Sequence, residues 1–160
     1  MTKMLVINPD KCTGCRRCEL ACSLVKEREF NPARSRIQTI TFLEEAVYIP
    51  STCLQCEDPS CRKVCPSGAI WREGTNEAVQ VASERCVGCK MCLLACPFGA
   101  MAFSGRDGKA VKCDLCGGQP ECVDFCEAGA LEYKESESAM VSRRIAASEK
   151  LKEAYRTLGG

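Results

Sequence analysis

Short alternations of apolar and polar residues recur along the chain and predict a series of small β-hairpins. The stretch from Arg36 to Pro50 alternates in this way and ends in Val47-Tyr48-Ile49, so we expect a hairpin there. Ile70 to Val81 and Met101 to Val111 each predict a shorter hairpin, with turns near residues 74–76 and at residues 105–108. The pattern therefore favours an α+β fold with short β-hairpins.

The two ends of this region carry apolar segments that match each other. Leu5-Val6-Ile7 near the start and Leu131-Glu132-Tyr133 near the end both predict short strands. We expect these strands to pair, which would bring the two ends of the region together.

The last segment of the chain has a helical pattern instead. From about residue 137 to residue 158 there is neither proline nor glycine, and apolar residues such as Met140, Leu151 and Leu158 recur at helical spacing. An isolated helix of this length is marginal in water, so its apolar stripe needs a surface to pack on. That surface is either the helix's own protein or another chain, and the sequence leaves both open.

Cysteine dominates the composition. The 160 residues include 16 cysteines and no histidine, which excludes histidine-based catalysis, histidine-ligated haem and every Cys/His zinc site. A net charge of +1 without a basic block argues against nucleic acid as a partner. No apolar run approaches the roughly 20 residues that a transmembrane helix needs, so we expect no direct membrane span.

The start of the chain decides how the cysteines are interpreted. Met1-Thr2-Lys3-Met4-Leu5 lacks the apolar stretch and the cleavage site of a signal peptide, so we expect a cytoplasmic protein. A reducing cytosol keeps thiols reduced, which argues against disulfides. Metal or metal–sulfur ligation is then the leading explanation for so many cysteines.

The cysteines fall into four quartets, with none left over. Two quartets are compact, with the spacing C-x2-C-x2-C-x3-C, and two are expanded by two or three residues before the third cysteine. The compact quartets are Cys12, Cys15, Cys18, Cys22 and Cys86, Cys89, Cys92, Cys96. The expanded quartets are Cys53, Cys56, Cys61, Cys65 and Cys113, Cys116, Cys122, Cys126.

Zinc ions and iron–sulfur clusters are the two groups that these quartets could bind. Four all-cysteine zinc sites would use the same 16 thiolates, but zinc ribbons supply C-x2-C pairs separated by a longer loop. Here three cysteines fall within seven residues in each compact quartet, which suits three corners of a cubane. The run from Cys86 to Pro97 matches the bacterial ferredoxin pattern in full, in which the fourth cysteine serves another cluster. Sixteen ligands predict four [4Fe–4S] clusters without an open iron site.

Residues Lys3 to about Tyr133 resemble the four-cluster ferredoxin-type subunits of multi-subunit oxidoreductases, such as dimethyl sulfoxide reductase, formate dehydrogenases and hydrogenases. The start of the chain, from Cys12 to Ser23, is most similar to the small subunits of the tungsten aldehyde oxidoreductase and carbon monoxide dehydrogenase type. The chain departs from the pattern at Ser23 and Glu127, where a proline would follow the fourth cysteine. The resemblance rests on the stretches Cys53-Leu54-Gln55-Cys56 with Cys65-Pro66, Cys86-Val87-Gly88-Cys89 through Cys96-Pro97-Phe98-Gly99-Ala100, and Lys112-Cys113-Asp114-Leu115-Cys116.

In that family the quartets pair as nested ferredoxin domains, the first with the fourth and the second with the third. Spacing alone does not choose this pairing over pairing in sequence order. The resemblance implies the modules 1–35 with 104–134 (outer) and 51–103 (inner), an inserted hairpin at 36–50, and an amphipathic helix at 135–160. The implied ligand sets are Cys12, Cys15, Cys18, Cys126 (cluster 1), Cys113, Cys116, Cys122, Cys22 (cluster 2), Cys53, Cys56, Cys61, Cys96 (cluster 3), and Cys86, Cys89, Cys92, Cys65 (cluster 4).

The implied function is electron transfer without catalysis. The resemblance predicts a relay of single electrons between a large catalytic subunit, first of all a tungsten or molybdenum aldehyde oxidoreductase, and another redox carrier. A hydrogenase or carbon monoxide dehydrogenase partner is the alternative of the same class. A free soluble polyferredoxin and a purely structural metal scaffold are the other two hypotheses. The C-terminal helix is a candidate contact with the partner or with further copies of the chain.

Basic residues stand among the ligands. Each oxidised cubane with four thiolates carries about −2, so four would change the net charge from +1 to about −7. The simplest interpretation of most of these basic side chains is a solvated surface that offsets part of this charge. They are Arg16, Arg17, Arg62, Lys63, Arg85, Lys90 and Lys112.

Overall fold

Short antiparallel strand pairs and helices make up the fold. The computed structural model describes residues 3–73 and 78–157. The strand pairs are β1 (Lys3–Ile7) with β8 (Leu131–Glu135), β2 (Ile37–Phe42) with β3 (Val47–Thr52), β4 (Ile70–Trp71) with β5 (Gln80–Val81), and β6 (Ala102–Phe103) with β7 (Ala110–Val111). The α-helices are α1 (Arg17–Glu27), α2 (Ser60–Lys63), α3 (Met91–Ala95), α4 (Glu121–Asp124) and α5 (Ser136–Thr157). The expected α+β class is confirmed.

The three expected hairpins form. The β2–β3 hairpin runs to Thr52, two residues beyond the expected end at Pro50. In β4–β5 Ile70 pairs with Val81, while the turn expected near residues 74–76 lies outside the described residues. Strands β6 and β7 pair around the expected turn at residues 105–108.

The expected pairing of the two ends is confirmed as well. Strands β1 and β8 are antiparallel, with Leu5 opposite Tyr133 and Ile7 opposite Leu131. Asn8 extends this contact, because its backbone N–H donates to the carbonyl of Ala130 at 2.8 Å. The pairing closes one lobe of the molecule with segments that are more than 120 residues apart in sequence.

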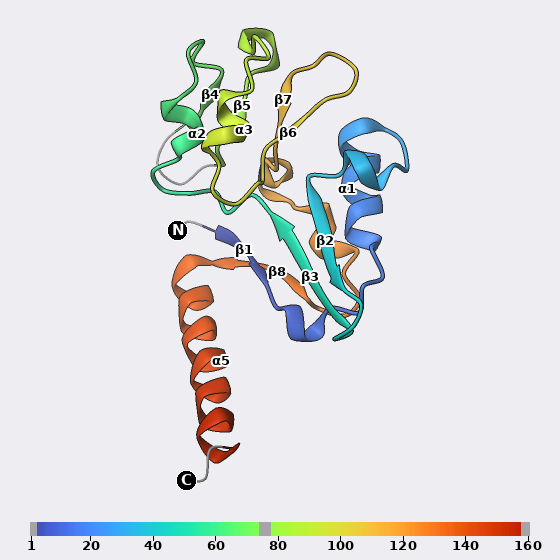
Figure 1. Cartoon of the computed structure of the whole chain (residues 1–160), viewed down its shortest axis with the longest axis vertical. Helices are drawn as coiled ribbons and strands as arrows, with labels where there is room; N and C mark the ends of the chain where they lie inside the picture. The colour runs from blue at the N-terminus through green and yellow to red at the C-terminus, as the bar shows by residue number, and fades with distance from the viewer. Residues whose placement is uncertain (1–2, 74–77, 158–160) are drawn as a thin grey trace.

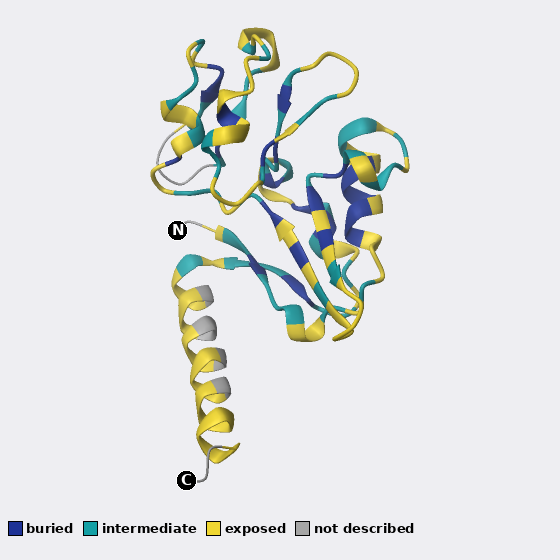
Figure 2. Cartoon of the chain, in the orientation of Figure 1, coloured by how far each residue is buried: buried dark blue, intermediate teal, exposed yellow. Residues whose placement is uncertain are grey.

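The fold has two lobes with separate apolar cores (Figure 1). One lobe, hereafter the hairpin lobe, contains β4 to β7 with α2 and α3, and the other, the closure lobe, contains β1, β2, β3 and β8 with α1 and α4. Figure 2 shows buried positions in both. The core of the hairpin lobe is formed by Ile70, Val79, Cys92, Met101 and Ala110. The core of the closure lobe is formed by Cys18, Cys22, Ile37, Cys122 and Leu131.

Helix α1 is longer than a turn around one quartet requires. It continues past Cys22 to Glu27 because Ser23, unlike proline, keeps its backbone N–H and fits a helix interior. The Ser23 side chain is fully buried, donates to the carbonyl of Leu20 at 3.0 Å and accepts the N–H of Asn31 at 3.2 Å. By contrast, α3 ends at Ala95, just ahead of a Cys-Pro pair. The departure at Ser23 therefore has a structural consequence.

Helix α5 extends away from both lobes (Figure 1). The expected helix forms over Ser136–Thr157, and residue 158 lies outside the described residues. At its start α5 contacts β1 and β8, but the described apolar side chains along it are exposed, including Ile145 at 55%, Leu151 at 67% and Tyr155 at 74%. The sequence left open whether this helix packs on its own protein or on another chain. Beyond its start, the described part of α5 does not pack on its own protein.

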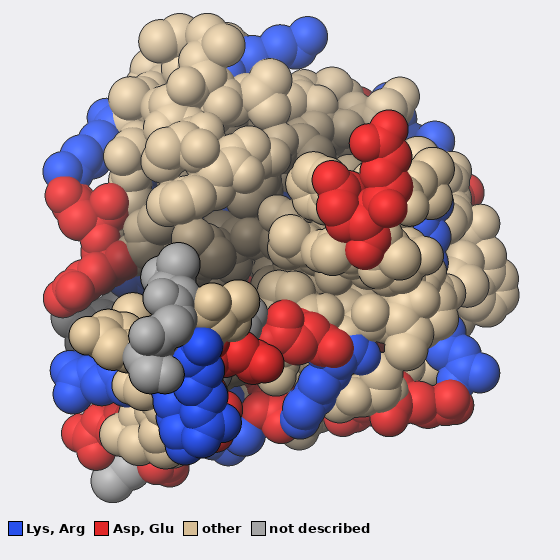
Figure 3. Space-filling view, turned by 60° about the horizontal axis from the view of Figure 1, so that its bottom comes forward, with Lys and Arg blue, Asp and Glu red and all other residues tan. Residues whose placement is uncertain are grey.

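The surface is mixed in charge. On the face shown in Figure 3, basic and acidic side chains are interspersed and do not gather into a basic stripe. This distribution agrees with the low net charge and offers no electrostatic footprint for nucleic acid on that face. None of the described helices has both the length and the apolar character needed to cross a membrane.

Candidate metal centres

The structure gathers the cysteines around four cavities, each lined by four of them. Every cavity takes three cysteines from one quartet and one from a distant quartet. The sets are Cys12, Cys15, Cys18, Cys126 (cavity A), Cys22, Cys113, Cys116, Cys122 (cavity B), Cys53, Cys56, Cys61, Cys96 (cavity C), and Cys65, Cys86, Cys89, Cys92 (cavity D). These groupings are the same as the four ligand sets that the family resemblance implied.

The donors in each cavity fit a cluster better than a single ion. Among the described residues, no group of three cysteine or acidic side chains converges on one metal position. A zinc ion requires such convergence, because its four ligands lie at about 2.0 to 2.3 Å from one atom. A cubane instead separates its four thiolates, each of which binds a different iron atom. Four cysteines spaced around a cavity are the arrangement that suits a [4Fe–4S] cluster.

Left-handed backbone positions shape the ligand loops. Gly14 and Gly88 both have φ of +70°, which glycine adopts without strain, and each directly precedes the second cysteine of a compact quartet. At the same place in the expanded quartets stand Gln55, with φ of +53°, and Leu115, with φ of +57°. The four loops therefore share a left-handed residue at this position despite their different sequences.

Backbone amides contact several of the sulfur atoms. The N–H of Arg36 donates to Cys22 Sγ at 3.2 Å, and the N–H of Ala110 donates to Cys86 Sγ at 3.4 Å. Hydrogen bonds of this kind favour the negative thiolate over the neutral thiol. They are also among the factors that set cluster potentials.

Burial acts against ionisation of several of these thiols. It raises the pKa of Cys18 to about 11 and raises the pKa of Cys122, where the neighbouring Cys113 acts in the same direction. At Cys65 burial also opposes ionisation, but the Ser67 hydroxyl and nearby backbone amides together lower its pKa. Because thiolates are the ligands, loading of the buried sites must displace protons.

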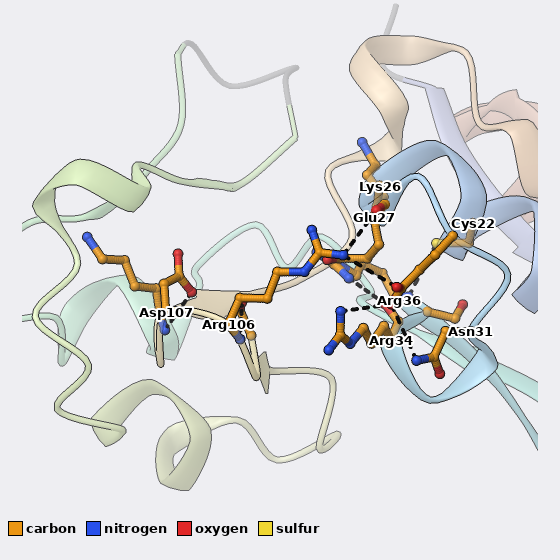
Figure 4. A network of polar contacts seen from close by, with 12 residues as sticks. Cys22, Lys26, Glu27, Asn31, Arg34, Arg36, Arg106 and Asp107 are labelled. Carbon is orange, nitrogen blue, oxygen red and sulfur yellow. Dashed lines mark hydrogen bonds and ion pairs between the residues drawn. The ribbon is translucent and has the colours of Figure 1, made fainter.

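A charged network lies beside cavity B (Figure 4). Arg36 and Glu27 form an ion pair whose side chains are only 10% and 11% exposed. Lys26, which lines cavity B, pairs with Asp114 at 2.7 Å. Arg106, from the β6–β7 turn, donates to the carbonyl of Glu27 at 3.4 Å and so connects the hairpin lobe with the C-terminal end of α1.

Most of the basic residues among the ligands are exposed, as expected, but Lys112 is not. Its side chain is buried, with 7% of the residue exposed, and it lines cavity C. Its ammonium donates to the carbonyls of Val79 and Cys113 and to the side-chain oxygen of Gln55. The interpretation as solvated surface is therefore wrong for Lys112. Sequence spacing gave no signal for its burial, because lysine next to a ligand is usually solvated.

The acidic residue at the second departure from the family pattern is paired. Glu127, which follows Cys126, forms an ion pair with Arg17 of α1, and both side chains are at least half exposed. Its negative charge is therefore offset locally and screened by water.

Arg72 holds the loop that lines cavity C, because its side chain donates to the carbonyls of Gln55 and Cys56.

Comparison with known proteins identifies the family. The chain matches the 4Fe-4S dicluster domain family twice, over residues 11–69 and over residues 44–136. It is 44% identical over 126 residues to the polyferredoxin-like subunit of an aliphatic sulfonate oxidoreductase from Pyrococcus furiosus, covering 78% of this chain and 72% of that protein. It is 36% identical over 145 residues to one of the chains of anaerobic dimethyl sulfoxide reductase from Escherichia coli, covering 79% and 70%.

One further relative and one solved structure are also similar to this chain. A putative electron transport protein from Escherichia coli is 37% identical over 155 residues, which cover 89% of this chain and 96% of that protein. A chain of the active site complex BamBC of benzoyl coenzyme A reductase is 24% identical, with a TM-score of 0.47 over 97% of this chain and 98% of that one. With 16 cysteines for two dicluster domains, the chain carries four [4Fe–4S] clusters. It belongs to the 4Fe-4S dicluster family as a ferredoxin-type, non-catalytic electron-transfer subunit of oxidoreductases.

Proposed function

We propose that cavities A, B, C and D are the sites of clusters 1, 2, 3 and 4, held by the four cysteines that line each one. The observation that carries this proposal is the division of all 16 cysteines into four cavities of four, with no cysteine shared or left over. Cavities A and B then form the outer ferredoxin-like module and cavities C and D the inner one. The separate cores of the two lobes support this nested arrangement.

The clusters supply one-electron exchange, and the chain supplies their spacing and surroundings. Two features of the chain support a relay that crosses both modules. In Thr52-Cys53 and again in Lys112-Cys113, adjacent residues line cavity B and cavity C, so these two cavities are neighbours. Cys15 of cavity A and Cys89 of cavity D are the exposed ligands, so cavities A and D face the solvent. Electrons would then pass between partners docked near these ends.

The partner that we propose is a large catalytic oxidoreductase subunit with a tungsten or molybdenum centre. The support is the similarity of the first quartet to tungsten aldehyde oxidoreductase small subunits, together with 44% identity to a subunit of an aliphatic sulfonate oxidoreductase. Helix α5 provides an exposed surface for such a contact. We propose that α5 contacts the catalytic subunit, and a second copy of this chain is the other candidate for that contact.

The first test is chemical analysis of the anaerobically purified protein. Four clusters require about 16 iron and 16 sulfide per chain, and reduction by dithionite should bleach the brown colour. Stoichiometric zinc with little iron, or iron without a reversible low-potential signal, would leave only a structural scaffold.

The second test concerns the partner. An untagged chain isolated under mild conditions from its own cells should co-purify with a larger subunit that contains tungsten or molybdenum. Purification of the fully loaded chain alone, in a fraction free of both metals, would instead support a free polyferredoxin.

A further inference from the structure

A buried cation lies at the boundary between cavities B and C. Lys112 lines cavity C, and the next residue, Cys113, lines cavity B. The three acceptors of the Lys112 ammonium are all neutral oxygens, with the Cys113 carbonyl at 2.6 Å and Gln55 Oε1 at 3.3 Å. Within residues 3–73 and 78–157, no carboxylate forms an ion pair with it.

Gln55 fixes this ammonium in place. Its side-chain NH2 donates to the carbonyl of Cys113 at 2.7 Å, and its side-chain oxygen accepts the N–H of Val79 at 2.9 Å as well as the Lys112 ammonium. Gln55 does this from a left-handed backbone position, with φ of +53°, which is strained for a non-glycine residue. Such strain persists where surrounding contacts hold the residue in one conformation.

A buried ammonium without a carboxylate is costly unless another negative charge offsets it. The negative charge available at Lys112 is that of the loaded cavity, about −2 when oxidised and about −3 after reduction. Because the site is buried, water and salt screen this attraction poorly. The attraction is stronger for the more negative form, so it favours reduction.

We propose that Lys112, positioned by Gln55, raises the reduction potential of the cluster in cavity C and so makes that site an electron acceptor at the boundary between the two modules. The inference rests on the proposed assignment of Cys53, Cys56, Cys61 and Cys96 to this cluster. Lys63, two residues after the cavity C ligand Cys61, offers a contrast: its side chain is 63% exposed and pairs with Asp58. A charge there is screened by water and by its partner.

The experiment is a redox titration of the loaded full-length protein, followed by EPR. The cavity C signal is first identified as the one lost in Cys61→Ser. In Lys112→Met we expect the ratio of reduced to oxidised cluster in cavity C, measured from that signal at one fixed solution potential, to fall at least fivefold. Lys63→Met removes the same formal charge and should change the ratio less than twofold. A change below fivefold in Lys112→Met, or an equal change in Lys63→Met, would overturn the proposal.

A second variant tests the proposal if Lys112→Met fails to assemble its clusters. If Lys112→Met does not take up iron, Gln55→Glu decides, because a carboxylate beside the ammonium offsets its charge and should lower the same ratio at least fivefold. An unchanged or raised ratio, or failure of both variants to load, would show that Lys112 has a purely structural role. The iron content and the number of EPR signals of the wild-type protein test the proposed function separately. If the wild type loads normally and the ratio in the variants is unchanged, only this inference is contradicted.

Discussion

The position before the second cysteine of each quartet shows how a single residue shapes a ligand loop. Gly14 not only has positive φ but also lies against Tyr48 of β3. A Cβ built on Gly14 would lie 2.5 Å from Tyr48 Cδ1, far closer than carbon atoms approach in proteins. Gly129, in the same lobe, has a φ of +63° with open space around it. The two glycines thus separate the effect of backbone strain from that of a close contact.

We predict that Gly14→Ala destabilises the loaded protein more than Gly129→Ala does. Both substitutions place alanine at positive φ, which costs about 1 kcal/mol or more. Gly14→Ala adds overpacking against the Tyr48 ring, typically about 1–3 kcal/mol. The midpoint temperature of cluster bleaching under anaerobic conditions should therefore fall by several degrees more for Gly14→Ala. Equal midpoints would mean that the Tyr48 ring moves aside without cost.

Residue spacing predicts the ligands of this protein but not the groups around them. Sixteen cysteines in four quartets, and the C-x2-C-x2-C-x3-C-P run, carry the cluster chemistry directly in the sequence. Lys112 is different, because its burial depends on Gln55 and Val79, which come from segments 57 and 33 residues away in the sequence. No local pattern encodes that contact.

Elements with local signals were predicted well. The hairpins follow from alternation and turn residues, and β1–β8 follows from two short apolar segments that flank the cysteine region. The full length of α1 was not predicted, because the ligand spacing indicates only a short turn. Its extension depends on Ser23, whose hydroxyl is fixed by Leu20 and Asn31 inside the folded lobe.

Helix α5 is the element whose surroundings the sequence left open. We predict that ending the chain after Glu135 leaves iron content unchanged at about 16 per chain, because the truncation keeps both lobes and all of β8. The same truncation should abolish co-purification of the catalytic subunit, because α5 exposes apolar side chains that need a covering surface. Iron analysis and native mass spectrometry measure the two effects.

Point variants provide the matched control for the truncation. Leu151→Glu introduces a charge at an apolar position that is 67% exposed, and should weaken partner binding without loss of iron. Glu149→Lys, at an exposed position already occupied by a charge, should leave binding nearly unchanged. Loss of iron on truncation would instead assign α5 to the stability of its own protein, and a halved native mass of the isolated chain would identify a second copy as the occupant.

At the scale of the whole molecule, the chain crosses between sites that lie far apart in sequence. Cys126 lies with Cys12, Cys15 and Cys18 in cavity A, while Cys22 lies with the fourth quartet in cavity B. The β1–β8 pairing that closes this lobe brings the first and fourth quartets together. With the ligands proposed above, crossing of this kind would make each cluster a cross-link between distant segments and so add to the small apolar cores that a chain of this size can form.

The crossing predicts different outcomes for two substitutions only four residues apart. Cys126→Ala removes a ligand from cavity A, so it should damage the cluster that Cys12, Cys15 and Cys18 hold. Cys122→Ala removes a ligand from cavity B and should damage the cluster that includes Cys22. EPR spectra of the two loaded variants should therefore lose different signals, with Cys15→Ala reproducing the loss seen in Cys126→Ala. If Cys126→Ala and Cys122→Ala lose the same signal, each quartet holds its own cluster. If Cys15→Ala does not reproduce the loss seen in Cys126→Ala, the first and fourth quartets are not paired, as in pairing in sequence order. Either outcome would show that the nested assignment is wrong.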